Sequence, residues 1–372
     1  MGKNFFKRIT IIFGTRPEAI KLARLIYELK KEEVIETRVI STGQHKEMVQ
    51  QVNDLFDIEV DKNLELMKHG QSINELTSNI LNKLREEFLN FHPDLILVQG
   101  DTTSAFAAAL AAFYEKIPVG HVEAGLRTES LLNPYPEELN RRLISQISSL
   151  HFAPTQKSFQ NLSANNIKKN VFITGNTIID ALLHVKDKAK PVESLRIDWD
   201  KNKVLLASVH RRENWGNNLE EIALGLKKII DLFPEVYLVL PMHKNLKVRE
   251  PLERVLGKHE RVILCEPFNY LEMIGAIKNS YLIVTDSGGL QEEAPTFGKP
   301  VLVLRETTER NEGIEAGVSK LIGTNQNNIV EELSSILKNK NAYDSMSRTN
   351  NPYGDGKSSE RIKNICLDFL GL

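Results

Sequence analysis

The sequence predicts an α/β protein made of two domains, each an open parallel sheet with helices on both faces. Short, wholly apolar runs rich in β-branched residues alternate with longer amphipathic segments, which is the pattern of parallel strands and crossover helices. A chain of 372 residues is also longer than one hydrophobic core usually serves. Residues 186–202 are charged, contain a proline and interrupt the alternation, so we place the linker between the domains at or just before them.

The strands and helices expected from this pattern account for most of the chain. Strands are predicted at residues 9–13, 37–42, 95–99, 119–123, 204–210, 236–242, 262–265, 281–285 and 301–304. Helices are predicted at residues 17–30, 72–91, 104–115, 136–149, 219–232 and 289–297. The segment 351–359 contains turn residues and precedes a last amphipathic helix.

Composition argues against several classes of protein. The 48 basic and 49 acidic residues give a formal net charge of −1, which provides no global field to attract nucleic acid or an anionic membrane. Cys265 and Cys366 match no metal-binding spacing, which favours reduced thiols in a cytoplasmic protein. No stretch approaches the roughly 20 apolar residues needed to cross a bilayer, and the run at 9–13 is too short for a signal peptide. We therefore expect a cytoplasmic protein that holds any anion through local groups.

Polar residues cluster where the predicted strands end. They are Gly14-Thr15-Arg16, Gln44-His45, Asp101 and Glu123 in the first half, and His210, His243 and Asp286-Ser287-Gly288-Gly289 in the second. In open parallel sheets, ligands bind at the carboxyl ends of the strands. Two such edges in one chain predict a cleft lined by both domains.

The segment 285–300, TDSGGLQEEAPTFGKP, has features of a diphosphate site. It follows an apolar strand, Asp286 or Ser287 can cap the next helix, and Gly288-Gly289 let a ligand approach exposed backbone N–H groups. Glu293, one turn further on, can accept both hydroxyls of a ribose. An ordinary capped helix with a solvated acidic face explains the segment equally well.

The segment 14–21, GTRPEAIK, predicts a positively charged pocket. Pro17 suits the first position of a helix, which places Arg16 at the helix N-terminus. The side chain of Lys21 tilts back toward that end and adds a second cation. For Lys21 the simpler interpretation, a solvated surface lysine, is favoured.

Three acids in the first half are candidates for proton transfer: Asp101, Glu123 and Glu137. Asp101 can instead cap a helix, and Glu137 can be a first-turn residue stabilised by the helix dipole. Glu123 closes an apolar run, where a charged residue needs a partner. Acids whose surroundings separate their pKa values are what general acid and base catalysis requires.

Two histidines follow strands of the second half. His210 precedes Arg211 and Arg212, a grouping that can stabilise negative charge on a leaving phosphate. His243 is placed similarly, and for each histidine a structural hydrogen bond is the alternative. None of the nine histidines forms an HExxH motif or pairs with a cysteine motif, so we expect no catalytic metal.

Taken together, FGTRPEAIK, QGDTT, PVGHVEAGLRT, PYPEELNR, ITGNTIIDAL, HRREN, TDSGGLQEEAPTFGKPVLVLRETTER and NPYGDG resemble the motifs of the non-hydrolysing UDP-N-acetylglucosamine 2-epimerases. The resemblance covers nearly the whole chain, in order and spacing. It implies two Rossmann-like domains in a GT-B arrangement, with the cleft between them. By this resemblance the domains cover residues 1–180 and 181–357, and the helix 358–372 returns to the first.

The resemblance implies interconversion of UDP-GlcNAc and UDP-ManNAc, a precursor of bacterial surface polysaccharide, with no nicotinamide or other cofactor. The proton on C2 of the sugar is not acidic in the ground state, because no carbonyl adjoins it. Breaking the C1–O bond gives an oxocarbenium-like centre, as in glycoside hydrolysis, and acidifies that proton. Departure of UDP then produces a 2-acetamidoglucal. This intermediate is reprotonated on the other face of C2, and UDP adds to C1 again.

Several residues match the family's functional positions. The active-site residues are matched by Arg16, Lys21, Asp101, Glu123, Glu137 and His210. The contacts to diphosphate and ribose are matched by Ser287, Gly288, Gly289, Glu293 and Arg310, and the uracil region by Phe268 and Met273. By this match the three acids transfer protons, in an order that stays open, and His210 stabilises departing UDP with help from Arg16.

The resemblance also has implications for the regulation and the assembly of the protein. Some bacterial members bind UDP-GlcNAc as an activator at a second site, here matched by Gln44, His45, Arg211 and His243. Glu47 and Gly70 stand where such members carry Gln and Arg, so dependence on an activator stays open. A homodimer is expected from the resemblance alone.

Other functions stay open at this point. A 2-epimerase for a modified UDP-sugar, such as a diacetamido uronic acid, would use the same residues. A GT-B glycosyltransferase would share the UDP site but leave GHVEAG and PYPEE unexplained. A hydrolysing epimerase would release free ManNAc, and a silent nucleotide-sugar sensor would bind without turnover. A redox epimerase is disfavoured because no strand is followed by GxGxxG.

Overall fold

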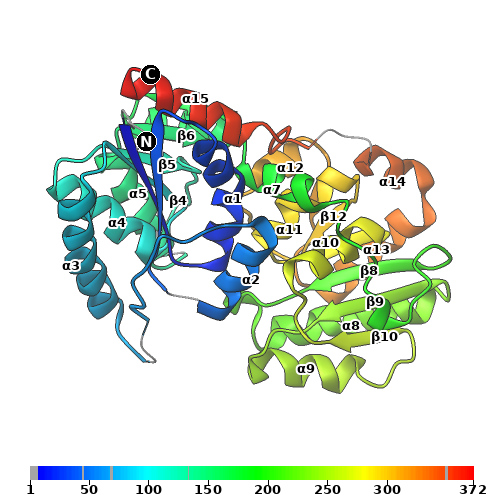
Figure 1. Cartoon of the computed structure of the whole chain (residues 1–372). Coiled ribbons are helices and arrows are strands. Elements are labelled where there is room, and N and C mark those ends of the chain that lie inside the picture. The colour runs from blue at the N-terminus through cyan, green and yellow to red at the C-terminus, as the bar shows by residue number, and fades with distance from the viewer. Residues whose placement is uncertain (1–6, 44–45, 68–69, 133, 348–350) are drawn as a thin grey trace. The chain divides into compact units, whose positions relative to one another are not determined.

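The computed structural model describes residues 7–43, 46–67, 70–132, 134–347 and 351–372 (Figure 1). The chain divides into two compact units, one formed by Met1–Ala181 with Tyr353–Leu372 and the other by Leu182–Pro352. Each unit contains one sheet whose strands pair in parallel. The predicted fold class, two doubly wound parallel-sheet α/β domains, is confirmed.

The sheet of the first unit has the strand order β3-β2-β1-β4-β5-β6-β7. The bounds are β1 Lys7–Phe13, β2 Ile35–Ser41, β3 Lys62–Asn63, β4 Leu95–Gln99, β5 Val119–Val122, β6 Leu150–Ala153 and β7 Val171–Ile173. The chain winds outward in one direction from β1 and in the other from β4, so the topological switch point lies between these two strands. Ligands of open parallel sheets bind at such a point.

The helices of the first unit cover both faces of its sheet. Their bounds are α1 Arg16–Lys30, α2 Lys46–Phe56, α3 Ile73–Phe91, α4 Thr103–Tyr114, α5 Glu137–Ile147, α6 Gln156–Ala164 and α15 Ser358–Leu370, with α7 Thr177–Val185 at the boundary between the units. Helix α4 packs between α3 and α5, and α1 packs against α2 and α15. Six buried alanines on α4 let it approach the sheet closely.

The second unit is built in the same way, with the strand order β10-β9-β8-β11-β12-β13. Its strands are β8 Lys203–Ser208, β9 Val236–Pro241, β10 Val262–Cys265, β11 Leu282–Thr285, β12 Val301–Val303 and β13 Ser319–Leu321. Its helices are α8 Asn217–Leu232, α9 Leu246–Leu256, α10 Tyr270–Asn279, α11 Gly288–Glu293, α12 Asn311–Glu315, α13 Gln326–Lys338 and α14 Lys340–Ser347. The switch point of this sheet lies between β8 and β11.

Every strand predicted from the sequence is present, with ends that differ by at most two residues. The strands β3, β6, β7 and β13, each two to four residues long, were not predicted. The helix predicted at 289–297 is wrong in its second half. Helix α11 gives way to a 3₁₀ turn at Ala294–Phe297, where Pro295 has no N–H to continue an α-helix.

The last helix, α15, is bound to the first unit by buried polar contacts. Asp180 on α7 accepts hydrogen bonds from the backbone N–H of Ser358 at 3.2 Å and of Ser359 at 2.7 Å. Lys363 on α15 forms an ion pair of 2.6 Å with Glu32, just beyond α1. A carboxylate is well suited to the exposed N–H groups and positive dipole of a helix N-terminus. In the described part of the chain, no helix is long and apolar enough to cross a membrane.

We predict that Asp180→Ala lowers the free energy of unfolding by about 1–3 kcal/mol, because two buried N–H groups at the start of α15 lose their acceptor. Urea unfolding followed by circular dichroism measures the change. Asp368→Ala on the exposed face of the same helix is the control, with an expected change below about 0.5 kcal/mol. Equal stability of the two variants would contradict this account of how α15 is held.

Candidate active site

The turn between β1 and α1 is fixed by close packing and by a buried carboxylate. A Cβ on Gly14 would lie 2.3 Å from Ser104 Oγ, so only glycine fits there. Glu18 accepts hydrogen bonds from the N–H groups of Gly14 and Thr15 at 3.0 and 2.7 Å. It also accepts one from the Thr102 hydroxyl at 2.7 Å. Glu18 therefore joins the loops after β1 and β4, which orients Arg16 at the first position of α1.

Glu18 was not among the residues predicted for the site. Burial raises its pKa above the usual value, and the hydrogen bonds from Thr102, Thr15 and Gly14 oppose that rise. Its spacing from Thr15 is that of a capping box, which the structure contains. That local signal was present in the sequence, whereas the contact with Thr102 was not.

Glu123 directly follows β5 and has the partner that its position requires. Lys21 Nζ lies 2.5 Å from Glu123 Oε1, and Gln99 donates to Oε2, also at 2.5 Å. Asn176 donates a longer hydrogen bond of 3.4 Å to Oε1. The side chains of Lys21 and Glu123 are 11% and 7% exposed, so the interpretation of Lys21 as a solvated surface residue is wrong.

The backbone of Glu123 has a φ of +66°. Residues other than glycine adopt this left-handed conformation at a cost of order 1–3 kcal/mol, and such strain clusters at functional sites. The side chain contacts Lys21 on α1 and Gln99 at the end of β4. A Cβ added to Gly100 would lie 3.6 Å from Glu123 Oε2, so Glu123 lies close to the residue that precedes Asp101.

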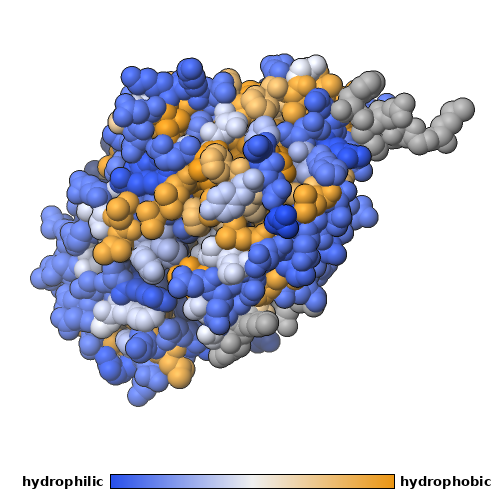
Figure 2. Space-filling model, turned by 90° about the vertical axis from the view of Figure 1, so that its left-hand side faces the viewer, coloured by the Kyte–Doolittle hydropathy of each residue, from blue (hydrophilic) through white to orange (hydrophobic). Residues whose placement is uncertain are grey.

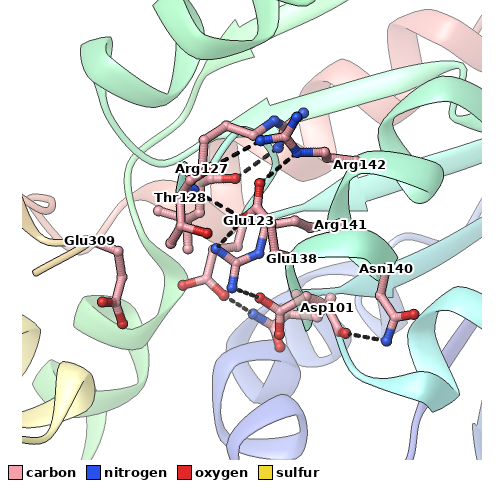
Figure 3. A network of polar contacts seen from close by, with 12 residues as sticks. Asp101, Glu123, Arg127, Thr128, Glu138, Asn140, Arg141, Arg142 and Glu309 are labelled. Atoms are coloured by element: carbon pink, nitrogen blue, oxygen red, sulfur yellow. Dashed lines mark hydrogen bonds and ion pairs between the residues drawn. The ribbon is translucent and has the colours of Figure 1, made fainter. Parts of the chain in front are cut away.

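Asp101 is held in place by two residues of helix α5. Arg141 on α5 forms an ion pair of 2.6 Å with its carboxylate, and Asn140 donates to its backbone carbonyl at 2.9 Å. Asp101 is not the cap of α4, because Thr102 fills that role. Figure 3 shows Asp101, Glu123 and Arg141 grouped together.

Arg141 is itself oriented by a buried acid. Glu138 lies 3.3 Å from Arg141 and 2.6 Å from Arg142, and it accepts a hydrogen bond from the N–H of Thr128 at 3.0 Å (Figure 3). Its side chain is fully buried. The network therefore joins Asp101 to the loop after β5 through fixed side chains. Glu138 was not singled out in the sequence analysis.

His121 fixes the peptide that precedes Asp101. Its Nε2 lies 2.7 Å from the carbonyl oxygen of Gly100 and must carry the hydrogen, because the carbonyl only accepts. Burial lowers the pKa of His121 to about 3, so the ring is neutral at neutral pH. His121 therefore orients the β4–α4 turn without adding charge to it.

A pocket of about 470 Å³ opens where four helices of the first unit begin. Asp101 and Glu137 both line it, and Glu137 is the first residue of α5. The other lining residues are Thr15, Pro17, Met67, Gln71, Ser72, Ile73, Leu76, Thr102, Thr103, Pro136 and Asn140. The N-termini of helices favour anionic ligands, and the apolar side chains suit a ligand that also has methyl or ring carbons.

In the second unit, Asp286 has a role that differs from the predicted helix cap. Its carboxylate accepts from the N–H of His210 at 3.0 Å, the N–H of Arg211 at 2.9 Å and the amide of Asn214 at 2.9 Å. Ser287 occupies the N-cap position of α11 but makes no side-chain cap hydrogen bond. Asp286 thus joins the loop after β8 to the turn after β11.

Arg310 lies over the glycine turn at the start of α11. A Cβ on Gly288 would be 3.1 Å from the Arg310 guanidinium carbon, so a side chain there would displace it. Glu292 and Glu309 bind this guanidinium at 2.9 and 2.8 Å. Burial alone would raise the pKa of Glu309, but Arg310, Arg305 and Arg211 together hold it well below its usual range. Arg310 is therefore a fixed positive charge beside Gly288.

The remaining predicted residues are dispersed over the second unit. The rings of His210 and His243 stack, with centroids 6.2 Å apart. Phe268 is buried before α10, Met273 is half-buried on that helix, and Glu293 is buried at the end of α11. Gly289 is the second residue of α11. Gln44 and His45 lie outside the described residues, and within the described ranges no group of His, Cys, Asp and Glu could hold a metal ion.

A family model described as UDP-N-acetylglucosamine 2-epimerase matches residues 27–367 of this chain. The UDP-N-acetylglucosamine 2-epimerase of Escherichia coli (strain K12) is 48% identical, over 95% of this chain and 97% of that protein. The crystal structure of UDP-GlcNAc 2-epimerase from Neisseria meningitidis bound to UDP-GlcNAc is 45% identical and covers 97% of this chain and 100% of that one, with a TM-score of 0.91.

A more distant solved structure agrees with these two. Methanocaldococcus jannaschii UDP-GlcNAc 2-epimerase in complex with UDP-GlcNAc and UDP is 34% identical and covers 97% of this chain and 99% of that one, with a TM-score of 0.82. The similarity extends over nearly the full length of every protein compared. The chain therefore belongs to the UDP-N-acetylglucosamine 2-epimerase family, as its motifs predicted.

Proposed function

We propose that this enzyme interconverts UDP-GlcNAc and UDP-ManNAc at C2 by elimination and re-addition of UDP. The relative from Neisseria meningitidis was solved bound to UDP-GlcNAc, which supports this substrate. The observation that carries the mechanism is the pair of cation-held carboxylates at the carboxyl ends of β4 and β5. Glu123 is bound by Lys21 and Asp101 by Arg141, next to the pocket that Glu137 lines.

The proposed reaction balances without an external oxidant or reductant. The C1–O bond breaks and its electron pair leaves with UDP, while a carboxylate removes the proton from C2 and a C1–C2 double bond forms. A carboxylic acid then returns a proton to the opposite face of C2, and UDP attacks C1 again. Positive charge at C1 makes the C2 proton acidic, as the oxocarbenium-like centre does in glycoside hydrolysis. No nicotinamide or metal takes part in this scheme.

We assign the proton transfers to Asp101, Glu123 and Glu137. The ion pairs with Arg141 and Lys21 restrict two of these carboxylates to one orientation, and a fixed base needs less reorganisation to reach its proton. Glu137 starts α5 and faces the same pocket as Asp101. Three acids are enough to supply a base on one face of C2 and an acid on the other.

We assign UDP to the second unit. The N–H groups at Ser287, Gly288 and Gly289 and the charge of Arg310 suit the diphosphate, and Glu293 suits the ribose hydroxyls. The backbone near Phe268 and Met273 would contact uracil. His210, helped by Arg16, would stabilise UDP as it departs. Arg211 and His243, with Gln44 and His45, would contact an activating UDP-GlcNAc.

We further propose that the product supplies ManNAc units for bacterial surface polysaccharide, that the enzyme acts in the cytoplasm and that it works as a homodimer. Exposed apolar residues on the helices of the first unit support a dimer. They include Phe113 and Tyr114 at the end of α4 and Leu139 and Leu143 on α5. Figure 2, which views the molecule from the side of α3 to α5, shows apolar patches among hydrophilic side chains. Burial of such patches favours association.

Replacing Glu123 by Gln is expected to lower kcat by about 100- to 10,000-fold, because an amide cannot exchange the C2 proton. Conversion of UDP-GlcNAc is followed by NMR, and UDP binding by calorimetry. Glu87→Gln is the matched control, since Glu87 also pairs with a cation, Arg38 at 2.7 Å, and is 12% exposed. Activity of Glu123→Gln equal to that of the control would remove Glu123 from the mechanism.

In D₂O, wild-type enzyme is expected to place solvent deuterium at C2 of both sugar nucleotides, because the elimination exposes that carbon to exchange. NMR of UDP-GlcNAc incubated with enzyme and no acceptor measures the label and identifies the product. Release of free ManNAc would indicate a hydrolysing enzyme, and epimerisation without label at C2 would exclude elimination. Repeating the reaction from UDP-ManNAc, with and without added UDP-GlcNAc, tests activation.

The wild-type protein is expected to sediment at twice the 42.2 kDa mass of one chain. The double variant Tyr114→Glu/Leu143→Glu should sediment as a monomer, because buried carboxylates oppose association through these helices. Leu246→Glu on α9 is the control, because Leu246 is 64% exposed in the other unit. A monomeric wild-type protein would contradict the proposed dimer.

A further inference from the structure

Asp286 is a fully buried carboxylate at the switch point of the second sheet. It lies directly after β11, and three groups of the loop after β8 donate hydrogen bonds to it: the N–H of His210, the N–H of Arg211 and the amide of Asn214. A buried carboxylate with several donors is rigid, because any rotation would leave one of them without an acceptor. Asp286 therefore fixes the backbone at His210.

The same carboxylate also faces the His210 ring. Nδ1 of His210 lies 3.3 Å from Asp286 Oδ1. An ionised carboxylate only accepts hydrogen bonds, so it favours the form of the ring that carries a hydrogen on Nδ1. Nε2, on the other side of the imidazole, then points away from Asp286, and it donates to an anionic ligand when the ring is protonated.

We propose that Asp286 is a positioning residue for the elimination step, which holds the His210 imidazole by Nδ1 and directs Nε2 to the departing diphosphate. This inference rests on the proposed function. Ser287, Gly288 and Gly289, which are assigned to the diphosphate, immediately follow Asp286 in the chain. One side chain thus fixes the imidazole relative to the turn that would hold the same phosphates. A group positioned in this way needs no reorganisation as charge develops on the leaving oxygen.

The charges around His210 give Asp286 an electrostatic effect as well. Burial lowers the pKa of His210, Asp286 opposes that change, and Arg211 and His243 add to it. Asp286 lies in the β11–α11 turn, Arg211 in the loop after β8 and His243 in the loop after β9. If the negative charge of Asp286 is removed, burial and the charges of Arg211 and His243 remain, and all of these lower the pKa of His210. The imidazolium, which best stabilises a leaving phosphate, would then form only at lower pH.

The test compares wild-type enzyme with Asp286→Asn, which keeps the size of the side chain and removes its charge. We expect kcat to fall by about 10- to 1,000-fold, as for other carboxylates that orient a functional histidine. The dissociation constant for UDP should change by less than about threefold if the protein is folded and the ground state is unaffected. In a plot of kcat against pH, the decline at high pH should begin at a lower pH than in wild type, because the His210 imidazolium is lost earlier.

Two further variants separate positioning from a general structural role. Asp231→Asn is the matched control, because Asp231 at the end of α8 lies 3.3 Å from His259 in a second Asp–His pair, and its kcat should equal that of wild type. In a His210→Asn background, Asp286→Asn should cause little additional loss, because its effect acts through the ring. A loss as large as that in wild type would overturn the proposal.

An NMR titration of the histidine rings tests the contact without relying on turnover. The His210 signal is identified by its absence in His210→Asn. Wild-type protein should show hydrogen on Nδ1, and Asp286→Asn should show a lower pKa for this ring. Hydrogen on Nε2 in neutral wild-type His210, or an unchanged titration, would overturn the proposal. Failure of wild type to epimerise UDP-GlcNAc would instead overturn the proposed function, and with it the role of Asp286 in elimination.

Discussion

Glu123 places a negative charge at the carboxyl end of β5, and Lys21 balances it through an ion pair that is almost wholly shielded from water. Loss of one partner from such a pair leaves an uncompensated buried charge, which costs far more than the pair contributes to stability. The contact joins α1 to the ends of β4 and β5, because Gln99 binds the other oxygen of the same carboxylate. The position of α1, and of Arg16 at its start, therefore depends on Glu123.

Both sheets use a buried carboxylate to fix the loops at their switch point. In the first unit Glu18 binds two backbone N–H groups of its own turn and the hydroxyl of Thr102 on the neighbouring loop. In the second unit Asp286 binds the loop after β8. Where a strand turns into a helix, several backbone N–H groups have no partner within the helix, so a carboxylate that accepts hydrogen bonds from them is favourable. The second contact differs: it is a threonine hydroxyl in the first unit and the ring of His210 in the second. Only the second contact has the role that we propose for a leaving group.

The sequence predicted the fold class and the long strands because buried parallel strands are continuous apolar runs. It missed β3 and β13, which contain lysine and are too short to show a period. Residue types at strand ends correctly indicated that Asp101 and Glu123 lie at the carboxyl ends of strands, here β4 and β5. Their partners were not predictable in the same way, since Lys21 and Glu123 are separated by 102 positions. Asp286 or Ser287 was expected to cap α11, and the N-cap position is that of Ser287. The carboxylate of Asp286 instead accepts hydrogen bonds from N–H groups 75 and 76 residues away, which the local sequence could not reveal.

The distribution of charge between the units agrees with the demands of an elimination. The base must be an anion that stays near the C2 proton, whereas the leaving diphosphate must meet cations and N–H donors. In the first unit Lys21 and Arg141 hold carboxylates in place, and in the second Glu292 and Glu309 hold the guanidinium of Arg310 in place. Asp101, Glu123 and Arg310, three of the charges assigned to the proposed reaction, thus each have a counter-ion that orients them. In the proposed elimination, charges held in place in this way would need little reorganisation when the C1–O bond breaks, and that is the condition under which electrostatic stabilisation lowers a barrier most.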